Sequence, residues 1–193
     1  MSENVKLVAF AGSARRDSWN KKLVNVAAEG AREAGAEVTV VDLKDYPMPV
    51  FDQDDQAENG MDPNAEKLQQ ILIEHDGFMI ASPEYNSSVT PLLLNTIDWT
   101  TRSGHDGSEM GGYNGKTAVL MSASPGGLGG LRGLVHLRSI LGNIGVHVLP
   151  DQRAVGSAFK AFDEEGNMTD SDQENAIKKL GARLAEVTAK LKE

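Results

Sequence analysis

The stretch VKLVAFAGSARRDSWN, residues 5–20, changes from mainly apolar to mainly polar residues near its midpoint. Residues 5–11 are apolar except for Lys6 and have the length of a buried strand, whereas the polar residues after them precede an amphipathic helix. Hydroxyl groups, an amide, arginines and free backbone N–H groups are therefore expected to meet where a strand ends and a helix begins. Proteins of alternating strands and helices bind phosphate at such a point, because the helix dipole and the unpaired N–H groups favour negative charge.

The polar half of this stretch contains residue types that hold a phosphate. Gly12 allows close approach of the backbone, and an arginine adds a fork of donors that suits a phosphate group. The candidate ligands are Ser13, Arg15, Ser18 and Asn20. The loop has neither the GxxxxGKS/T nor the GxGxxG pattern, which disfavours a P-loop nucleotidase and a dinucleotide-binding Rossmann site. The alternative is a polar turn in which Ser18 caps the helix while Arg15 and Arg16 are solvated.

Strand and helix patterns alternate along the whole chain, which predicts a mostly parallel sheet with helices on both faces. The expected strands are residues 6–11, 37–43, 77–82, 117–122 and 146–149. The expected helices are residues 20–34, 62–75, 91–102, 128–143 and a final one that ends near residue 192, capped by Thr169 or Ser171. Residues 44–61 are expected to form a long loop, and short β pieces are expected to flank residues 165–167.

This order of elements fits a flavodoxin-like α/β fold. We expect a three-layer sandwich around a five-stranded parallel sheet with strand order 2-1-3-4-5. In that order the ligand crevice lies between the first and third strands, where the direction of winding reverses.

The composition excludes several classes of protein. With 193 residues the chain is expected to form one domain over residues 1–193, and its net charge of −9 disfavours nucleic acid and anionic membranes as partners. The absence of cysteine excludes disulfides, thiolate metal sites and a cysteine nucleophile. No apolar run approaches about 18 residues, and residues 1–4 lack the pattern of a signal peptide. We therefore expect a cytoplasmic protein without membrane insertion.

Two further loops follow the third and fourth expected strands and open onto the same edge of the sheet. Residues 82–91, SPEYNSSVTP, place a proline and a tyrosine beside an acid in a rigid turn, on which a planar ring can stack. Residues 122–130, SASPGGLGG, are rich in glycine, which removes side chains where a ligand comes close. The alternatives are a turn in which Thr90 caps a helix begun by Pro91, and a flexible connection. Together the three loops favour a mononucleotide with a planar ring system.

The strings GSARRDSWN, SPEYNSSVTPLLLNTIDW and SASPGGLGGLRGLVHLRSIL occur in this order at residues 12–20, 82–99 and 122–141. They resemble the motifs of the NADPH-dependent FMN reductase family, a flavodoxin-like group that includes bacterial quinone and chromate reductases. The resemblance covers residues 5–150 and implies bound FMN, with NADPH or NADH as the co-substrate.

The same resemblance implies a role for individual residues. The FMN phosphate would be held by Ser13, Arg15, Ser18 and Asn20. The isoalloxazine ring and its polar edge would be lined by Pro83, Glu84, Tyr85 and Asn86. The other side of the pocket would be closed by Ser122, Ser124, Gly126 and Gly127. No side chain is expected to act as the catalyst, because the flavin carries the redox chemistry.

The implied activity is that of an FMN-dependent NAD(P)H oxidoreductase. A nicotinamide would pass hydride to the flavin, and a quinone, azo dye, metal oxyanion or similar small acceptor would then occupy the same face, which predicts ping-pong kinetics. The alternative is a flavodoxin-type electron carrier or flavin sensor without NAD(P)H oxidation of its own. A response regulator is disfavoured, because Ser82 stands where the third strand would need an aspartate.

Residues outside the three loops suggest a partner and a nicotinamide contact. The helix expected at residues 128–143 is apolar over more than one stripe, and the resemblance implies a homodimer, or a tetramer built from two dimers. Arg102 and His105 are candidates for contact with the 2′-phosphate of NADPH, with a surface position as the alternative. The four histidines lack the spacing of metal ligands, so no metal site is expected.

Overall fold

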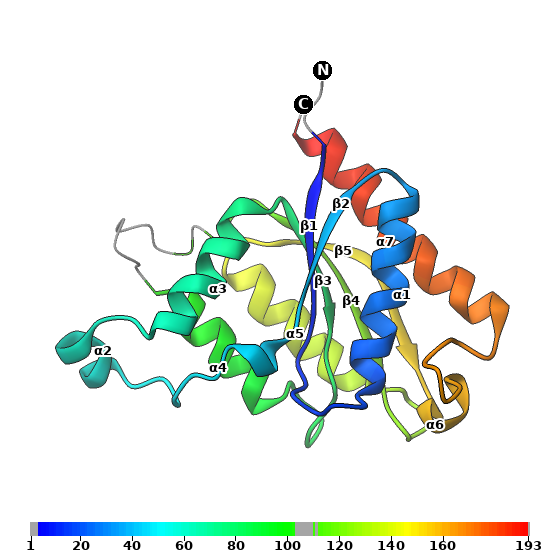
Figure 1. Ribbon diagram of the computed structural model, residues 1–193, viewed down its shortest axis with the longest axis horizontal. Coiled ribbons are helices and arrows are strands. Elements are labelled where there is room, and N and C mark those ends of the chain that lie inside the picture. The colour runs from blue at the N-terminus through cyan, green and yellow to red at the C-terminus, as the bar shows by residue number, and fades with distance from the viewer. Residues whose placement is uncertain (1–3, 103–109, 111, 193) are drawn as a thin grey trace.

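The computed structural model describes residues 4–102, 110 and 112–192. Its centre is a five-stranded sheet in which every neighbouring pair is parallel, with the order β2-β1-β3-β4-β5 (Figure 1). This is the topology predicted from the sequence. The strands are β1 Lys6–Ala11, β2 Glu37–Val41, β3 Gly77–Ala81, β4 Thr117–Ala123 and β5 His147–Val155.

The register of the strands decides where the loops emerge. Ala11 at the end of β1 lies opposite Ala81 at the end of β3, and Ser82, the residue after β3, donates its N–H to the Met121 carbonyl of β4 at 2.9 Å. Both β3 and β4 are buried over their whole length, as central parallel strands are. The loops after β1, β3 and β4 therefore leave the sheet at one edge.

Helices cover both faces of the sheet and give the sandwich its three layers. On one face lie α1 Trp19–Glu33 and α7 Ser171–Leu191, and on the other lie α3 Pro63–Glu74, α4 Pro91–Thr100 and α5 Leu131–Asn143 (Figure 1). Side chains of β1 alternate between the two layers, with Leu7 in the core beneath α1 and α7 and Val8 in the core on the other side.

Close packing fixes α1 in place. A Cβ atom on Gly30 of α1 would lie 2.0 Å from the Lys178 carbonyl oxygen of α7, and one on Gly181 would lie 1.9 Å from the Ala27 carbonyl oxygen. Only glycine permits the two helices to cross at this distance. The orientation of α1 relative to the sheet edge is consequently set by its contact with α7.

Hydrogen bonds through one side chain join the first loop to the second. Thr90 caps α4, as predicted, by accepting the Leu93 N–H at 3.2 Å, and its hydroxyl donates to the Gly12 carbonyl at 2.8 Å. The loops that follow β1 and β3 are thereby held side by side.

Several predicted boundaries are wrong. Residues 44–61 are not one long loop, because they include most of the short helix η1 Leu43–Asp45 and the whole of α2 Gln53–Asn59. The second of these buries no residue, so it leaves no apolar periodicity in the sequence. The helix α5 begins at Leu131 instead of residue 128, because Gly129 and Gly130 adopt φ of 63° and 88° outside the helical region.

The chain beyond β4 differs from expectation in two other ways. The strand β5 continues to Val155, six residues past its predicted end, and the final helix α7 is capped by Asp170 instead of a neighbouring hydroxyl. Between them lies α6 Ala158–Ala161, followed by a bridge between Phe162 and Met168 that confirms the short β pieces expected there. Within the part of the chain that the structure describes, no helix is long and apolar enough to cross a membrane.

Candidate functional site

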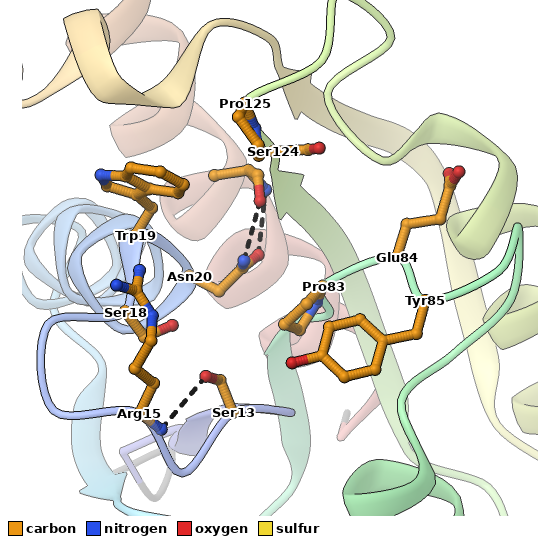
Figure 2. A pocket seen from close by; sticks show the side chains of 11 residues that line it. Ser13, Arg15, Ser18, Trp19, Asn20, Pro83, Glu84, Tyr85, Ser124 and Pro125 are labelled. Atoms are coloured by element: carbon orange, nitrogen blue, oxygen red, sulfur yellow. Dashed lines mark hydrogen bonds between the residues drawn. The ribbon is translucent and has the colours of Figure 1, made fainter.

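A cavity of about 170 Å³, open to solvent, lies at the edge of the sheet where β1, β3 and β4 end (Figure 2). The three loops predicted to share this edge all contribute to its wall. Its lining residues are Ser13, Arg15, Ser18, Trp19, Asn20, Pro83, Glu84, Tyr85, Ala123, Ser124 and Pro125. The predicted residues Asn86, Ser122, Gly126 and Gly127 do not line it. Trp19, Ala123 and Pro125 were not predicted, although all three lie inside the motifs and two of them, Trp19 and Pro125, carry flat side chains.

The first turn of α1 forms one wall of the cavity. Ser18 occupies the N-cap position, but its side chain makes no capping hydrogen bond, and the first turn contains no acidic residue. The first N–H groups of a helix have no partner within the helix, so they face the cavity without compensation. The guanidinium of Arg15 lies 5.1 Å from the centre of the Trp19 ring and adds positive charge beside them. This end of the cavity can bind an anion.

Asn20 uses its side chain to hold the cavity together. Its amide nitrogen donates to the Ala123 carbonyl at 2.9 Å, and the Ala123 N–H donates to its amide oxygen at 2.9 Å. The pair fixes the first turn of α1 to the end of β4 (Figure 2). The backbone N–H of Asn20, in the first turn of the helix, is thus the group that this residue offers to a ligand.

The second loop presents an aromatic ring on a strained turn. Tyr85 and Ser88 exchange two backbone hydrogen bonds of 3.0 Å, and Asn86 and Ser87 between them have φ of 52° and 64°. Such a pair of positive φ angles is typical of a type I′ turn and is unfavourable for side chains other than glycine or asparagine. The Tyr85 ring, 57% exposed, points toward the first loop and lies beside Pro83 (Figure 2). Together they form a flat apolar surface opposite Arg15.

Glu84 points the other way, toward α5 (Figure 2). Its Oε1 accepts from Arg132 Nε at 2.9 Å and Nη2 at 2.6 Å, and its Oε2 accepts the Gly133 N–H at 3.1 Å. Burial opposes the charged form, but the hydrogen bonds from Gly133 and Arg132 hold the pKa of Glu84 below its ordinary value. The carboxylate is therefore ionised and already bonded, which leaves the backbone of Glu84 to meet a ligand.

The third loop contributes Ser124 and Pro125 to the cavity, whereas Ser122 does not line it. The Ser122 side chain is fully buried, and its hydroxyl has no hydrogen-bond partner among the described residues. A Cβ atom on Gly130 would lie 2.0 Å from that hydroxyl oxygen, so glycine is needed for α5 to begin here.

Arg102 lies outside the cavity. Its guanidinium stacks 4.5 Å from the centre of the Phe51 ring, and its Nε donates to the Asp98 carbonyl at 3.0 Å. Arg102 follows the carboxyl end of α4 and does not line the cavity, and its contact with the 2′-phosphate of NADPH stays a prediction. His105 lies outside the described residues. Among those that are described, no group of histidine and acidic side chains is arranged to hold a metal ion.

Comparison with known proteins gives this geometry a context. A family model described as NADPH-dependent FMN reductase matches residues 5–160. An NAD(P)H:quinone oxidoreductase from Solanum tuberosum is 32% identical over 193 residues, which covers 97% of this chain and 95% of that protein. An NAD(P)H-dependent FMN reductase from Pseudomonas aeruginosa is 30% identical over 178 residues, or 92% of this chain and 91% of that protein. The structure of FerB, a flavoenzyme NAD(P)H:(acceptor) oxidoreductase from Paracoccus denitrificans, shares the fold with a TM-score of 0.80 at 23% identity, over 96% of this chain and 98% of that one.

Proposed function

Because this chain belongs to the NADPH-dependent FMN reductase family, we propose that the cavity at the sheet edge is its FMN site. The protein is an oxidoreductase of the NAD(P)H-dependent FMN reductase and quinone reductase type, with FMN as its cofactor and NAD(P)H as its reductant. We also propose that the whole chain acts as one FMN-binding domain, since α7 packs against α1, the helix that begins at the cavity.

The residues of the cavity fit FMN. The open first turn of α1 and the Arg15 guanidinium suit the phosphate, and the hydroxyls of Ser13 and Ser18 add donors. Across the cavity, Pro83 and Tyr85 suit a planar conjugated ring, with the backbone of residues 84–86 near its polar edge. The observation that carries the proposal is this opposition of an uncompensated helix end and a flat aromatic surface in one cavity.

The chemistry belongs to the flavin, which when bound accepts hydride from NAD(P)H and passes electrons to an acceptor. The chain orients the ring, holds the phosphate and leaves one face accessible beside the exposed Tyr85 side chain. We propose that nicotinamide and acceptor occupy that face in turn, which gives ping-pong kinetics. A quinone is the acceptor class that the Solanum tuberosum relative's name supports, and azo dyes and metal oxyanions are further candidates.

An apolar surface on α5 and the loop before it supports self-association. Leu128 is 57% exposed, Leu131 41% and Val135 60%, and all three lie near the start of the helix that contacts the Glu84 loop. We propose a homodimer through this surface, or a tetramer of two such dimers, in the cytoplasm. Sedimentation velocity checks this: Val135→Glu is expected to yield monomers at micromolar concentration, and a wild-type monomer would contradict the proposal.

The FMN site is tested by titration calorimetry on the apoprotein. FMN is expected to bind much more tightly than riboflavin, because riboflavin lacks the phosphate that the α1 end would hold. Equal affinity for the two would overturn the assignment of that end, and the absence of heat with either would overturn the site.

Steady-state kinetics test the order of the reaction. NADPH oxidation with a benzoquinone acceptor is expected to give parallel double-reciprocal lines. Intersecting lines would exclude alternate use of one face. Slow NADPH oxidation with every small acceptor would favour the electron-carrier alternative.

A further inference from the structure

Two helices begin beside the cavity without a side-chain cap of their own. They are α1, preceded by Ser18, and α5, preceded by Gly130 in the left-handed region with φ of 88°. Neither first turn contains an acidic residue. Both ends therefore present positive backbone charge toward the same region of the molecule.

The positive backbone charge at the amino end of α5 is neutralised by a residue of the loop after β3. Glu84 accepts the Gly133 N–H of its first turn at 3.1 Å, and its side chain is only 8% exposed. Arg132, in the same turn, adds a positive charge where the helix dipole disfavours one, and Glu84 pairs with that charge as well. One carboxylate thus neutralises the amino end of α5 and the arginine on it.

The same contact anchors the aromatic hairpin. Glu84 lies between Pro83 and Tyr85, and Ser88, at the other end of the turn, has its hydroxyl 2.9 Å from His136 Nδ1 of α5. The fit is close, because a Cβ atom on Gly133 would lie 3.1 Å from the Ser88 carbonyl oxygen and 3.4 Å from Glu84 Cβ. The hairpin, with its unfavourable φ of 64° at Ser87, is thereby held against α5 at both ends.

We propose that Glu84 is a positioning residue of the flavin site: it neutralises the amino end of α5, holds the Tyr85 surface in place, and balances the Arg132 charge at the side of the cavity that Glu84 itself lines. The inference rests on the proposed FMN site and goes beyond it in two respects. It makes α1 the only uncompensated helix end in the described part of the cavity, which fixes the end at which the phosphate binds. It also makes the Glu84–Arg132 pair a determinant of the flavin reduction potential.

Removing either charge of the Glu84–Arg132 pair is expected to shift the midpoint potential of bound FMN, and the two shifts have opposite directions. Glu84→Gln removes the carboxylate that lines the cavity and leaves the Arg132 charge unpaired, which favours the more negative reduced flavin, so the midpoint potential of bound FMN is expected to rise. Arg132→Gln leaves the Glu84 carboxylate unpaired, so the potential is expected to fall. The double variant is expected to return close to the wild-type value. Photoreduction with a reference dye measures all four potentials.

The affinity for FMN distinguishes the role of Glu84 in holding the Tyr85 hairpin from the role of its negative charge. Glu84→Gln weakens the contacts that hold the Tyr85 hairpin against α5, and a loss of about 1.4 kcal/mol of binding free energy corresponds to a roughly ten-fold rise in the Kd of FMN. Glu84→Asp keeps the charge but shortens the reach to Gly133, so Kd is expected to rise while the potential stays near wild type. Ser88→Ala loosens the other end of the hairpin without changing any charge, and it is expected to behave like Glu84→Asp.

The outcomes are distinct. Shifts in the same direction for Glu84→Gln and Arg132→Gln, or no shift in either, would overturn the inference while leaving the FMN site intact. A wild-type protein that binds no FMN would instead overturn the proposed function. If Glu84→Gln does not fold, Arg132→Gln and Glu84→Asp still decide the matter, since one is expected to lower the potential and the other to leave it unchanged.

Discussion

The helices α1 and α3 cover opposite faces of the sheet, yet their amino ends are built differently. At α3, the Asp62 carboxylate caps the helix by accepting N–H groups of Asn64 at 2.8 Å and Ala65 at 3.3 Å. A proline follows at the first position and an acid in the first turn. At α1, the Ser18 hydroxyl makes no such bond and no acid follows.

The carboxyl end of α3 is closed as well. Lys116, from the loop before β4, donates from Nζ to the Leu72 carbonyl and, at 2.9 Å, to the Ile73 carbonyl. The helix α3 therefore has a negative charge at its amino end, from Asp62, and a positive one at its carboxyl end, from Lys116, as its dipole favours. The helix α1 has no negative side chain in its first turn, at the end where the cavity lies. The contrast supports the proposal that the phosphate of FMN supplies the missing charge at α1.

The largest effect is expected when α1 receives an aspartate cap like that of α3, which removes the difference between the two amino ends. Ser18→Asp is expected to stabilise the apoprotein, because aspartate is a good N-cap, and to weaken FMN binding through repulsion of the phosphate. Two like charges about 4 Å apart at an effective dielectric constant of about 20 repel by about 4 kcal/mol, which corresponds to a roughly thousand-fold rise in Kd. Calorimetry measures the affinity and thermal unfolding the stability.

The control for this variant is Ser18→Asn, which offers a similar cap without the charge. It is expected to stabilise the apoprotein and to bind FMN far more tightly than Ser18→Asp. Wild-type FMN affinity in Ser18→Asp would contradict the assignment of the phosphate to α1.

A smaller effect is expected when a positive charge is removed from the same end. Arg15→Ala deletes a guanidinium that can donate to the phosphate, and a hydrogen bond between charged groups contributes about 1.5–3 kcal/mol. FMN affinity is expected to fall roughly ten- to hundred-fold, while riboflavin affinity stays unchanged. Arg16→Ala, at the exposed neighbouring position, is the matched control and is expected to have a much smaller effect. An equal loss for both ligands would place Arg15 against the ring instead.

Removing the cap of α3 tests the other half of the comparison. Asp62→Ala is expected to lower the free energy of unfolding by about 1 kcal/mol, with no change in FMN affinity. Asp52→Ala is a suitable control: the aspartate caps α2 in the same way, but that helix buries no residue, so the loss should be smaller. A change in FMN binding for Asp62→Ala would mean that the two helix ends are not independent. Urea denaturation measures both variants.

Much of this architecture is predictable from the sequence, because the decisive patterns are local. The apolar run at residues 7–11 and the polar loop after it mark the first strand and the open end of α1. The cap at Thr90 and the proline after it predict the start of α4. These signals depend on neighbouring residues only, and the fold that they imply is confirmed.

The features that could not be predicted depend on contacts distant in sequence. The pairing of Asn20 with Ala123 spans 103 residues, and that of Glu84 with Arg132 spans 48. Sequence patterns suggest which side chains can meet a ligand, but they do not reveal that these two are already bonded within the protein. The helix α2 was missed for a different reason, because an exposed helix has no apolar stripe to detect.

The smallest expected effect concerns the closed carboxyl end of α3 and depends on pH. Burial disfavours the charged form of Lys116 and lowers its pKa to about 8 from 10.5. Between these values the unfolded chain binds a proton that the folded protein has lost, so stability rises with pH across this window. The slope is bounded by about 1.4 kcal/mol per pH unit and is smaller here, because the side chain is partly exposed to solvent.

Lys116→Met removes this titration, so the wild-type advantage over the variant is expected to grow from pH 8 to pH 10. Lys67→Met, an exposed lysine on α3 itself, controls for the loss of one positive charge. Urea denaturation at several pH values measures the difference. A difference between wild type and Lys116→Met that stays constant over this range would show that the pKa of Lys116 is the same in the folded and unfolded protein. The hydrogen bonds to the Leu72 and Ile73 carbonyls would then offset the cost of burial at the closed end of α3, whereas the open end of α1 would still need an anion.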